Sequence, residues 1–191
     1  MCAEEKQALR RQMRARRAAL SLAERAAQAD QIAQRVLAHP AYRAAETIFC
    51  YCATPEEIDT RAILTDAFAR GKRVCVPLCQ TRGVMTAREI SGLDALCPGA
   101  YGILEPAPDS PVVPPDKIDL CVIPCLCTDT DGYRLGYGGG YYDRFLAQTD
   151  AVRAVLCAED RVLTQPLPRE KTDLPCDLIF TERQVFVSGE K

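Results

Sequence analysis

The sequence predicts an α/β fold, namely a three-layer α/β/α domain with a mainly parallel central sheet and an amino-terminal pair of helices. The first observation behind this prediction is composition, because 191 residues with 48% hydrophobic and 26% charged side chains are typical of one globular domain. The second is a pair of Ala-rich helical segments at the start. The third is the alternation of apolar strands and helical segments that follows, since strand–helix–strand crossovers require parallel pairing. We expect residues 1–191 to form a single domain.

The two amino-terminal helices are predicted from composition and from a capping signal. Residues Glu5–Leu20 are rich in good helix formers, with apolar residues spaced to line one face. Ser21 and Glu24 have the spacing of a capping box, in which each side chain binds a free backbone N–H of the other residue. A second helix is therefore expected over Leu22–Ala38, ending before Pro40.

A β-α-β unit follows these helices. We expect a strand over Glu46–Ala53, a helix over Asp59–Arg70 that ends at Gly71, and a parallel strand over Lys72–Leu78. The remainder is predicted in less detail. It comprises a strand at 84–90, a Pro- and Gly-rich surface segment at 98–115, a buried strand at 119–124, a long loop, a helix at 141–147, and strands at 152–157, 178–181 and 185–187.

The eleven cysteines are expected to be free thiols of a cytoplasmic protein. Their number is odd, and the chain is long enough to form a core without disulfides. The Cys125–Cys127 pair has no histidine or C-x-x-C partner that would complete a zinc pattern. No apolar run approaches the roughly 18 residues that span a bilayer, and residues 1–5 lack the layout of a secretory signal. We therefore expect no membrane partner.

Charge is distributed unevenly along the chain. Nine basic and four acidic residues between Met1 and Arg43 give this segment a net charge of +5, although the whole chain carries −2. Such a start could bind nucleic acid or a smaller polyanion such as a nucleoside triphosphate, but the acidic remainder disfavours a nucleic-acid surface. Lys6 and Arg10 lie one helical turn apart, and Arg14 and Arg17 continue the same side, where ordinary surface charges are expected to be solvated.

The segment 129–144 is the most informative part of the chain. Four of the five residues at 136–140 are glycines, placed between a buried strand and a predicted helix. In an α/β sheet this is the carboxyl edge, where ligands bind, and glycine N–H groups can converge there on phosphate oxygens. Arg134 adds a cation, and Asp143 is an oxygen ligand suited to Mg²⁺. The segment fits neither the Walker A pattern nor the dinucleotide fingerprint.

Several segments of the chain together resemble one enzyme family. The run R-L-G-Y-G-G-G-Y-Y-D-R-F-L at 134–146 is similar to the signature of the 5-formyltetrahydrofolate cyclo-ligases, also called methenyltetrahydrofolate synthetases. The match extends along nearly the whole chain, in the family's order. Its other parts are the K-x-x-L-R of Lys6, Leu9 and Arg10, the segment Glu56–Thr60, the segment Gly102–Pro106, and the region Asp173–Asp177.

The resemblance implies an ATP- and Mg²⁺-dependent conversion of 5-formyltetrahydrofolate to 5,10-methenyltetrahydrofolate with release of ADP and phosphate. It implies that Arg134 and Tyr142 are catalytic, that Asp143 and Asp173 bind magnesium, with Asp177 as the alternative to Asp173, and that Cys52 and Glu57 lie at the folate. The implied ATP-binding residues are Lys6, Arg10, Arg134, Leu135, Gly136, Tyr137, Gly138, Gly139, Gly140, Tyr141 and Tyr142, of which Tyr137, Gly138, Gly139, Gly140 and Tyr141 would also meet the folate.

This reaction suits a site without a nucleophilic side chain. An N5-formyl oxygen is a poor leaving group, so its phosphorylation by ATP would permit N10 to close the ring. The protein must then neutralise charge, align the reactants and exclude water. The chain departs from the family's usual P-G-x-x-F-D-like pattern at Pro124–Asp129, where Cys125 replaces glycine and Thr128 replaces the aromatic residue. That departure leaves open an ATP-dependent phosphotransferase of the same fold with a different small-molecule acceptor. We expect a monomer without nucleic-acid partners.

Overall fold

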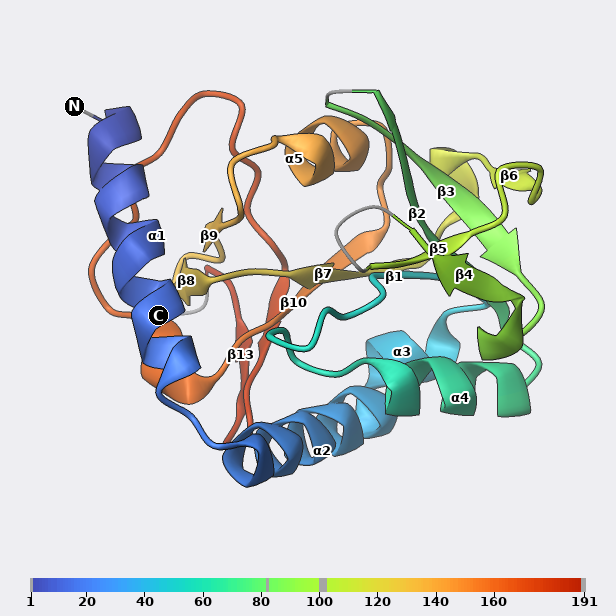
Figure 1. Ribbon diagram of the computed structural model, residues 1–191, viewed down its shortest axis with the longest axis horizontal. Coiled ribbons are helices and arrows are strands. Elements are labelled where there is room, and N and C mark those ends of the chain that lie inside the picture. Colours follow the sequence, from blue (N-terminus) through green and yellow to red (C-terminus); the bar gives the residue numbers. More distant parts are fainter. Residues whose placement is uncertain (1, 82, 100–102, 190–191) are drawn as a thin grey trace.

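A large, mainly parallel sheet forms the centre of the molecule. The computed structural model describes residues 2–81, 83–99 and 103–189 (Figure 1). The strands of the central sheet are β1 (Thr47–Cys50), β2 (Arg73–Thr81), β3 (Val84–Ile90), β6 (Val112–Val113), β7 (Leu120–Pro124), β10 (Val152–Leu156), β12 (Leu178–Phe180) and β13 (Val185–Val187). They form an eight-stranded sheet in the order β13-β12-β10-β7-β1-β2-β3-β6. The run from β12 to β2 is parallel, and β13, β3 and β6 pair antiparallel.

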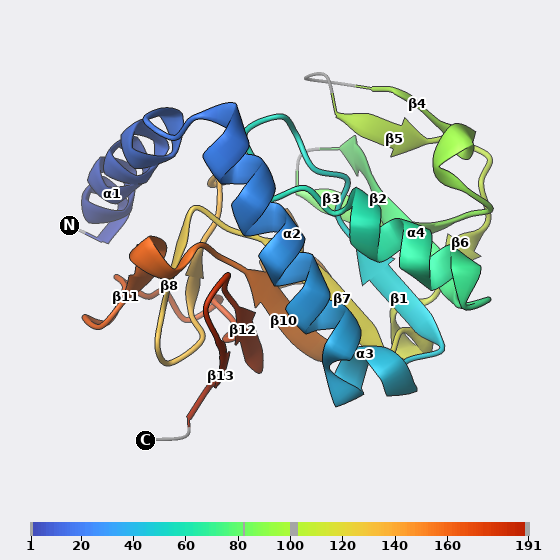
Figure 2. The same ribbon diagram turned by 90° about the horizontal axis from the view of Figure 1, so that it is seen from below.

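Helices cover both faces of this sheet, which confirms the predicted α/β architecture. One face carries α2 (Leu22–Ala38), α3 (Pro40–Ala44) and α4 (Arg61–Ala69), as the view from below makes clear (Figure 2). The opposite face carries α5 (Tyr141–Leu146), the one α-helix that the described residues place there (Figure 1). The third layer is therefore thinner than the other two and is completed by loops.

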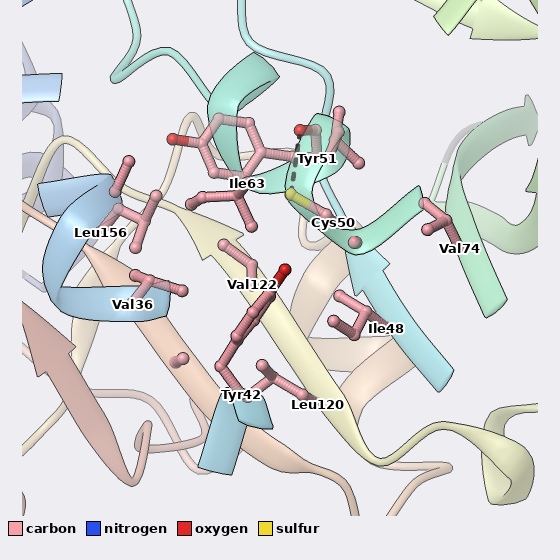
Figure 3. Close-up of a cluster of buried hydrophobic side chains, with 14 of the residues drawn as sticks. Val36, Tyr42, Ile48, Cys50, Tyr51, Ile63, Val74, Leu120, Val122 and Leu156 are labelled. Atoms are coloured by element: carbon pink, nitrogen blue, oxygen red, sulfur yellow. Dashed lines mark hydrogen bonds between the residues drawn. The ribbon is translucent and has the colours of Figure 1, made fainter. Parts of the chain in front are cut away.

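Side chains of β1 point alternately to the two faces of the sheet, so the strand contributes to a hydrophobic core on each face. Ile48 and Cys50 pack on the α2 side, whereas Phe49 packs against Phe145 of α5, with ring centroids 4.7 Å apart. Figure 3 shows the α2 side, where Tyr42 and Ile63 lie among side chains of the sheet. All four residues of β1 are buried, as expected for a strand covered on both faces.

The helix predictions succeed where a local signal marks the end of the helix. The capping box of α2 is present, since Ser21 Oγ accepts from Glu24 N at 3.2 Å and Glu24 Oε2 accepts from Ser21 N at 2.8 Å. Gly71 ends the α4 segment with φ +69°, the left-handed conformation that glycine adopts at no steric cost. The first helix, α1 (Cys2–Ala18), begins three residues earlier and ends two residues earlier than the predicted range Glu5–Leu20.

The prediction of a long loop after Pro124 is wrong, because this segment contains strands. A small sheet of order β11-β8-β9 stands beside the central one, and α1 packs on it. Its strands are β8 (Cys127–Asp129), β9 (Arg134–Leu135) and β11 (Val162–Leu163). Met13 of α1 is buried against Leu126 and Leu135 there. The two amino-terminal helices thus cover different sheets, and Figure 1 shows α1 beside β8 and β9 at the end of β7.

The Pro- and Gly-rich segment predicted to run over the surface also contains strands. Its described part includes β6 and the antiparallel pair β4 (Leu96–Pro98) and β5 (Leu104–Pro106). Gly102, the first residue of the proposed G-I-L-E-P motif, lies outside the described residues.

The cysteines from Cys50 to Cys176 are all free, and only Cys79 and Cys97 among them are exposed. Most of the thiols therefore serve as small apolar side chains of the core. Within the described chain, no helix combines the length and the apolar character needed to cross a membrane.

Candidate active site

A cleft of about 720 Å³ lies where α1, the glycine loop and a late segment meet. Each of the three walls comes from a different part of the chain. Lys6 and Arg10 belong to α1, residues 134–144 form the loop and the start of α5, and residues 170–174 precede β12. Pro124, at the carboxyl end of β7, lies at the edge. This is the place at which open parallel sheets bind ligands.

The glycines of the loop at 136–140 are favoured for three different physical reasons. Gly138 and Gly140 have φ values of +100° and +67°, and a Cβ is disfavoured in that region. A Cβ on Gly139 would lie 2.6 Å from the Tyr141 ring. Gly136 has neither constraint, because no atom lies within 4 Å of the place its Cβ would take. That space belongs to the cleft, so the absence of a side chain at Gly136 leaves room for a ligand.

Two arginines hold this loop through its main-chain carbonyls. Arg10 Nε donates to the Gly136 carbonyl at 2.9 Å. Arg144 Nη1 donates to the Gly139 carbonyl at 3.0 Å and to the Gly83 carbonyl, in the turn between β2 and β3, at 3.3 Å. The loop therefore keeps its shape through main-chain acceptors, and its N–H groups remain to meet an anion.

Arg134 and Asp143 form an ion pair at the base of the cleft. Arg134 Nη2 lies 3.0 Å from Asp143 Oδ1, and the arginine side chain is only 4% exposed. Arg134 Nη1 also donates to the Leu174 carbonyl at 3.2 Å. The guanidinium carbon lies 6.0 Å from the centre of the Tyr142 ring, so the two residues predicted to be catalytic are neighbours.

Lys6 joins α1 to the late segment of the chain. Its Nζ lies 2.6 Å from Asp173 Oδ2 and 3.6 Å from Glu170 Oε2, and the residue is 7% exposed. Asp173 Oδ2 also accepts from Glu170 N at 2.7 Å. Asp177, the alternative metal ligand, accepts from Arg153 N at 2.7 Å and does not line the cleft. The geometry therefore favours Asp173 over Asp177.

The carboxylates of this cleft fit a magnesium ion that shares its coordination with phosphate. Among the described residues, Oδ2 of Asp143 and Oδ1 of Asp173 accept no hydrogen bond, so each carboxylate retains one oxygen. The described part of the chain contains no cluster of three or more His, Cys, Asp or Glu side chains that could enclose a metal by themselves. Mg²⁺ usually takes one or two carboxylates together with substrate phosphates and water, so this donor set suits it.

The predicted folate residues lie near a group of tyrosines. Burial and the Glu57 carboxylate hold the pKa of Tyr142 well above its usual value, and the same two causes raise the pKa of Tyr137. Cys52 is buried, and burial raises the pKa of its thiol to about 12. At neutral pH these hydroxyl and thiol groups are therefore protonated.

One site residue was assigned wrongly from the sequence. Arg17, expected to be solvated, is 4% exposed, and its Nη1 donates to the Tyr137 hydroxyl at 2.7 Å. Its Nη2 donates to the Cys125 carbonyl at 2.8 Å. The signal was the spacing of Arg17 from buried Met13, because residues four apart share one helix face. Arg14 is exposed as expected, and its guanidinium carbon lies 5.7 Å from the centre of the Tyr137 ring.

The chain is similar to known proteins of one enzyme family. The model of the 5-formyltetrahydrofolate cyclo-ligase family matches residues 2–182. The chain is 30% identical to the 5-formyltetrahydrofolate cyclo-ligase of Escherichia coli K12 over 179 residues, covering 91% of this chain and 98% of that one. It is 28% identical to the mouse cyclo-ligase, covering 93% of each.

The fold is shared as well. The NMR structure of 5,10-methenyltetrahydrofolate synthetase from Aquifex aeolicus superposes with a TM-score of 0.86 and 26% identity, covering 97% of this chain and 94% of that one. The synthetase structure from Mycoplasma pneumoniae, at 23% identity and a TM-score of 0.75, has the same fold. With its fold, its cleft and these matches, the chain belongs to the 5-formyltetrahydrofolate cyclo-ligase family.

Proposed function

We propose that this chain converts 5-formyltetrahydrofolate to 5,10-methenyltetrahydrofolate, with ATP as phosphoryl donor and with release of ADP and phosphate. The observation that carries the proposal is the cleft itself, in a chain of this family. Its glycine loop leaves open space at Gly136, and its walls supply Lys6, Arg10 and Arg134 as cations. A triphosphate requires such a combination of main-chain donors and positive charge.

The cations and carboxylates of the cleft would have different roles in phosphoryl transfer. Arg134, fixed by Asp143 and by the Leu174 carbonyl, would stabilise charge on the transferred group without reorganisation. Tyr142 lies beside the Arg134 guanidinium and would hold its plane. Asp143 and Asp173 would hold Mg²⁺, which neutralises phosphate charge when bound. Lys6 would exchange part of its contact with Asp173 for the nucleotide.

The residues on the folate side would bind and shield the second substrate. Glu57 would accept hydrogen bonds from N–H groups of the pterin ring, and Tyr137 and Tyr141 would lie between the two ligands. The buried Cys52 would contribute an apolar contact, because its raised pKa keeps the thiol neutral. Transfer of the γ-phosphoryl group to the formyl oxygen makes that oxygen a good leaving group, so N10 can close the ring in a site that excludes water.

The alternative acceptor has little support in the site geometry. Of the unusual stretch Pro124–Asp129, only Pro124 lines the cleft. Thr128 is fully buried and donates to the Tyr133 carbonyl at 2.8 Å. Cys125 is buried in the core on the α5 side of the sheet. The substituted side chains therefore pack away from the ligands, and a different phosphoryl acceptor is not required to explain them.

Turnover with defined substrates tests the proposal. We expect Mg²⁺-dependent formation of ADP only when 5-formyltetrahydrofolate is present, together with the absorbance of the methenyl product. Loss of ATP without methenyl product, or faster turnover with another small acceptor, would contradict the proposal and favour the phosphotransferase.

We also propose that the protein acts in the cytoplasm as a monomeric single domain over residues 1–191, without nucleic-acid or membrane partners. The first helix supports the absence of a nucleic-acid partner, because Lys6, Arg10 and Arg17 are engaged within the protein. Light scattering at micromolar concentration tests the monomer. Steeply salt-dependent binding of DNA or RNA would contradict the absence of a nucleic-acid partner.

A further inference from the structure

We propose that Arg17 is a positioning residue, which holds the Tyr137 side chain on the folate side of the cleft. The inference rests on the proposed function and adds a residue from outside the cleft lining. Arg17 emerges from α1 on the buried side of the helix, and its contacts on the Tyr137 hydroxyl and the Cys125 carbonyl are 2.7 and 2.8 Å long.

The guanidinium is held rigidly enough to position another side chain. The Cys125 carbonyl directly follows β7, in the middle of the central sheet, so one end of the contact is fixed by the core. The planar fork of an arginine then sets the direction of the second bond, to Tyr137. Nε of Arg17 is buried and has no hydrogen-bond partner among the described residues, so the two Nη bonds are the main compensation for burying this charge.

The direction of the first bond leads from Arg17 through the Tyr137 hydroxyl towards the cleft. A guanidinium can only donate, so the Tyr137 oxygen is the acceptor and its own proton is available to a second group. Tyr137 lines the cleft, so that proton can be donated to a bound ligand.

The Tyr137 side chain and the backbone of the glycine loop are held by different arginines. The backbone of the glycine loop is held by Arg10 through the Gly136 carbonyl. The Tyr137 ring is held by Arg17, with Arg14 and Arg17 guanidinium carbons 5.7 and 5.9 Å from its centre. Removal of Arg17 should therefore release the folate side and leave the phosphate cradle in place. A residue needed only for docking α1 would instead disturb both substrates, because Lys6 and Arg10 lie on the same helix.

The test compares Arg17→Met with Arg16→Met, an exposed neighbour whose Nη1 donates to the Asp160 carbonyl at 3.3 Å. Methionine fills much of the buried volume but donates no hydrogen bond. We expect kcat/KM for 5-formyltetrahydrofolate to fall roughly 10- to 100-fold, as for loss of a hydrogen bond from a charged donor, with KM for ATP within about twofold of wild type. The Arg16→Met enzyme should match wild type. An equal rise in both KM values, or no change, overturns the inference.

A double-mutant cycle with Tyr137→Phe isolates the proposed route. If Arg17 acts through the hydroxyl, adding Arg17→Met to Tyr137→Phe should change kcat/KM by less than about threefold. Full additivity overturns the inference. If Arg17→Met does not fold, Arg17→Lys replaces it in the same cycle, because lysine keeps the charge and one donor. An inactive wild-type enzyme would refute the proposed function, whereas an active wild type with an unaffected Arg17→Met would refute only the positioning role.

Discussion

Arg134 Nη2 lies 3.0 Å from Asp143 Oδ1 at the base of the cleft, and the two side chains are 4% and 26% exposed. An arginine does not lose its proton in a protein, so the nearly buried Arg134 cation needs the partner that Asp143 provides. The proposed function gives the same carboxylate a second task, the binding of Mg²⁺. Substitution can separate the two tasks, because an amide oxygen can accept the hydrogen bond but lacks the negative charge with which a carboxylate binds Mg²⁺.

Asp143→Asn should therefore impair turnover more than stability. We expect the free energy of unfolding to fall by about 1 to 2 kcal/mol, since Arg134 keeps its bond to the Leu174 carbonyl. The Mg²⁺-dependent kcat/KM should fall by roughly 100-fold. Urea unfolding and steady-state kinetics measure the two effects, with Asp177→Asn as the control outside the cleft. If turnover per folded molecule is unchanged, Asp143 serves only as the partner of Arg134.

The parts of the fold that the sequence predicts well have local signals. The range Leu22–Ala38 is found as predicted because the capping box at Ser21 fixes one end and Pro40 limits the other. The small sheet was missed because β9 and β11 have two residues each, which is too short for a hydrophobic period. Their existence depends on pairs such as Val162 with Thr128, which come from distant parts of the chain.

The candidate site shows the same limit. The sequence predicts the part of the cleft formed by residues 134–144 because glycines, a cation and a carboxylate are adjacent there, and the family resemblance adds Lys6 and Asp173. Arg17 was missed because its partner Tyr137 is 120 residues away and no local pattern connects them. The general expectation that surface charges are solvated failed where one turn of α1 carries both Met13 and a buried arginine.

Lys6→Met should weaken nucleotide binding and loosen the contact between α1 and the late segment. The 2.6 Å bond to Asp173 is largely buried, so we expect a loss of about 1 to 3 kcal/mol in the free energy of unfolding. KM for ATP should rise about 10-fold, since one of the cations of the cleft is lost. The matched control is Lys117→Met, an exposed pair with Asp116 at 3.5 Å, which should change stability by less than about 1 kcal/mol. An unchanged KM for ATP would confine Lys6 to a structural role.

Because of its buried thiols, we expect the free energy of unfolding of the protein to fall at alkaline pH. Burial raises the pKa of Cys52, Cys121 and Cys127 to about 12 and that of Cys176 to about 11, from an ordinary value of 9.0. The unfolded chain therefore loses these protons first as the pH rises. The contribution of these thiols to the free energy of unfolding is therefore fully present below about pH 9 and is lost progressively towards pH 12. The free energy of unfolding falls by up to about 1.4 kcal/mol per pH unit for each thiol.

Urea unfolding at pH 7.5, 9.0 and 10.0 measures this effect. The control is Cys121→Ala, which removes one of the titrating groups and should reduce the slope by about 1.4 kcal/mol per pH unit at most. The substitution also creates a small cavity, which lowers stability equally at every pH. A free energy of unfolding that stays constant between pH 9 and 10 would contradict the prediction.

The glycine loop offers the sharpest separation of folding from binding. Gly138→Ala places a Cβ at φ +100° and should cost about 1 to 2 kcal/mol of stability. Gly136→Ala meets no atom within 4 Å and has no positive φ to oppose it, so stability should stay within about 1 kcal/mol of wild type. Its methyl group enters the cleft, however, and KM for ATP should rise at least about 10-fold because the backbone can no longer approach the phosphates. Gly71→Ala, with φ +69° and open space around it, is the control for backbone strain away from the cleft. If the Gly136→Ala enzyme binds ATP as wild type does, the nucleotide does not use the space beside this residue, and the loop would have to meet a different ligand.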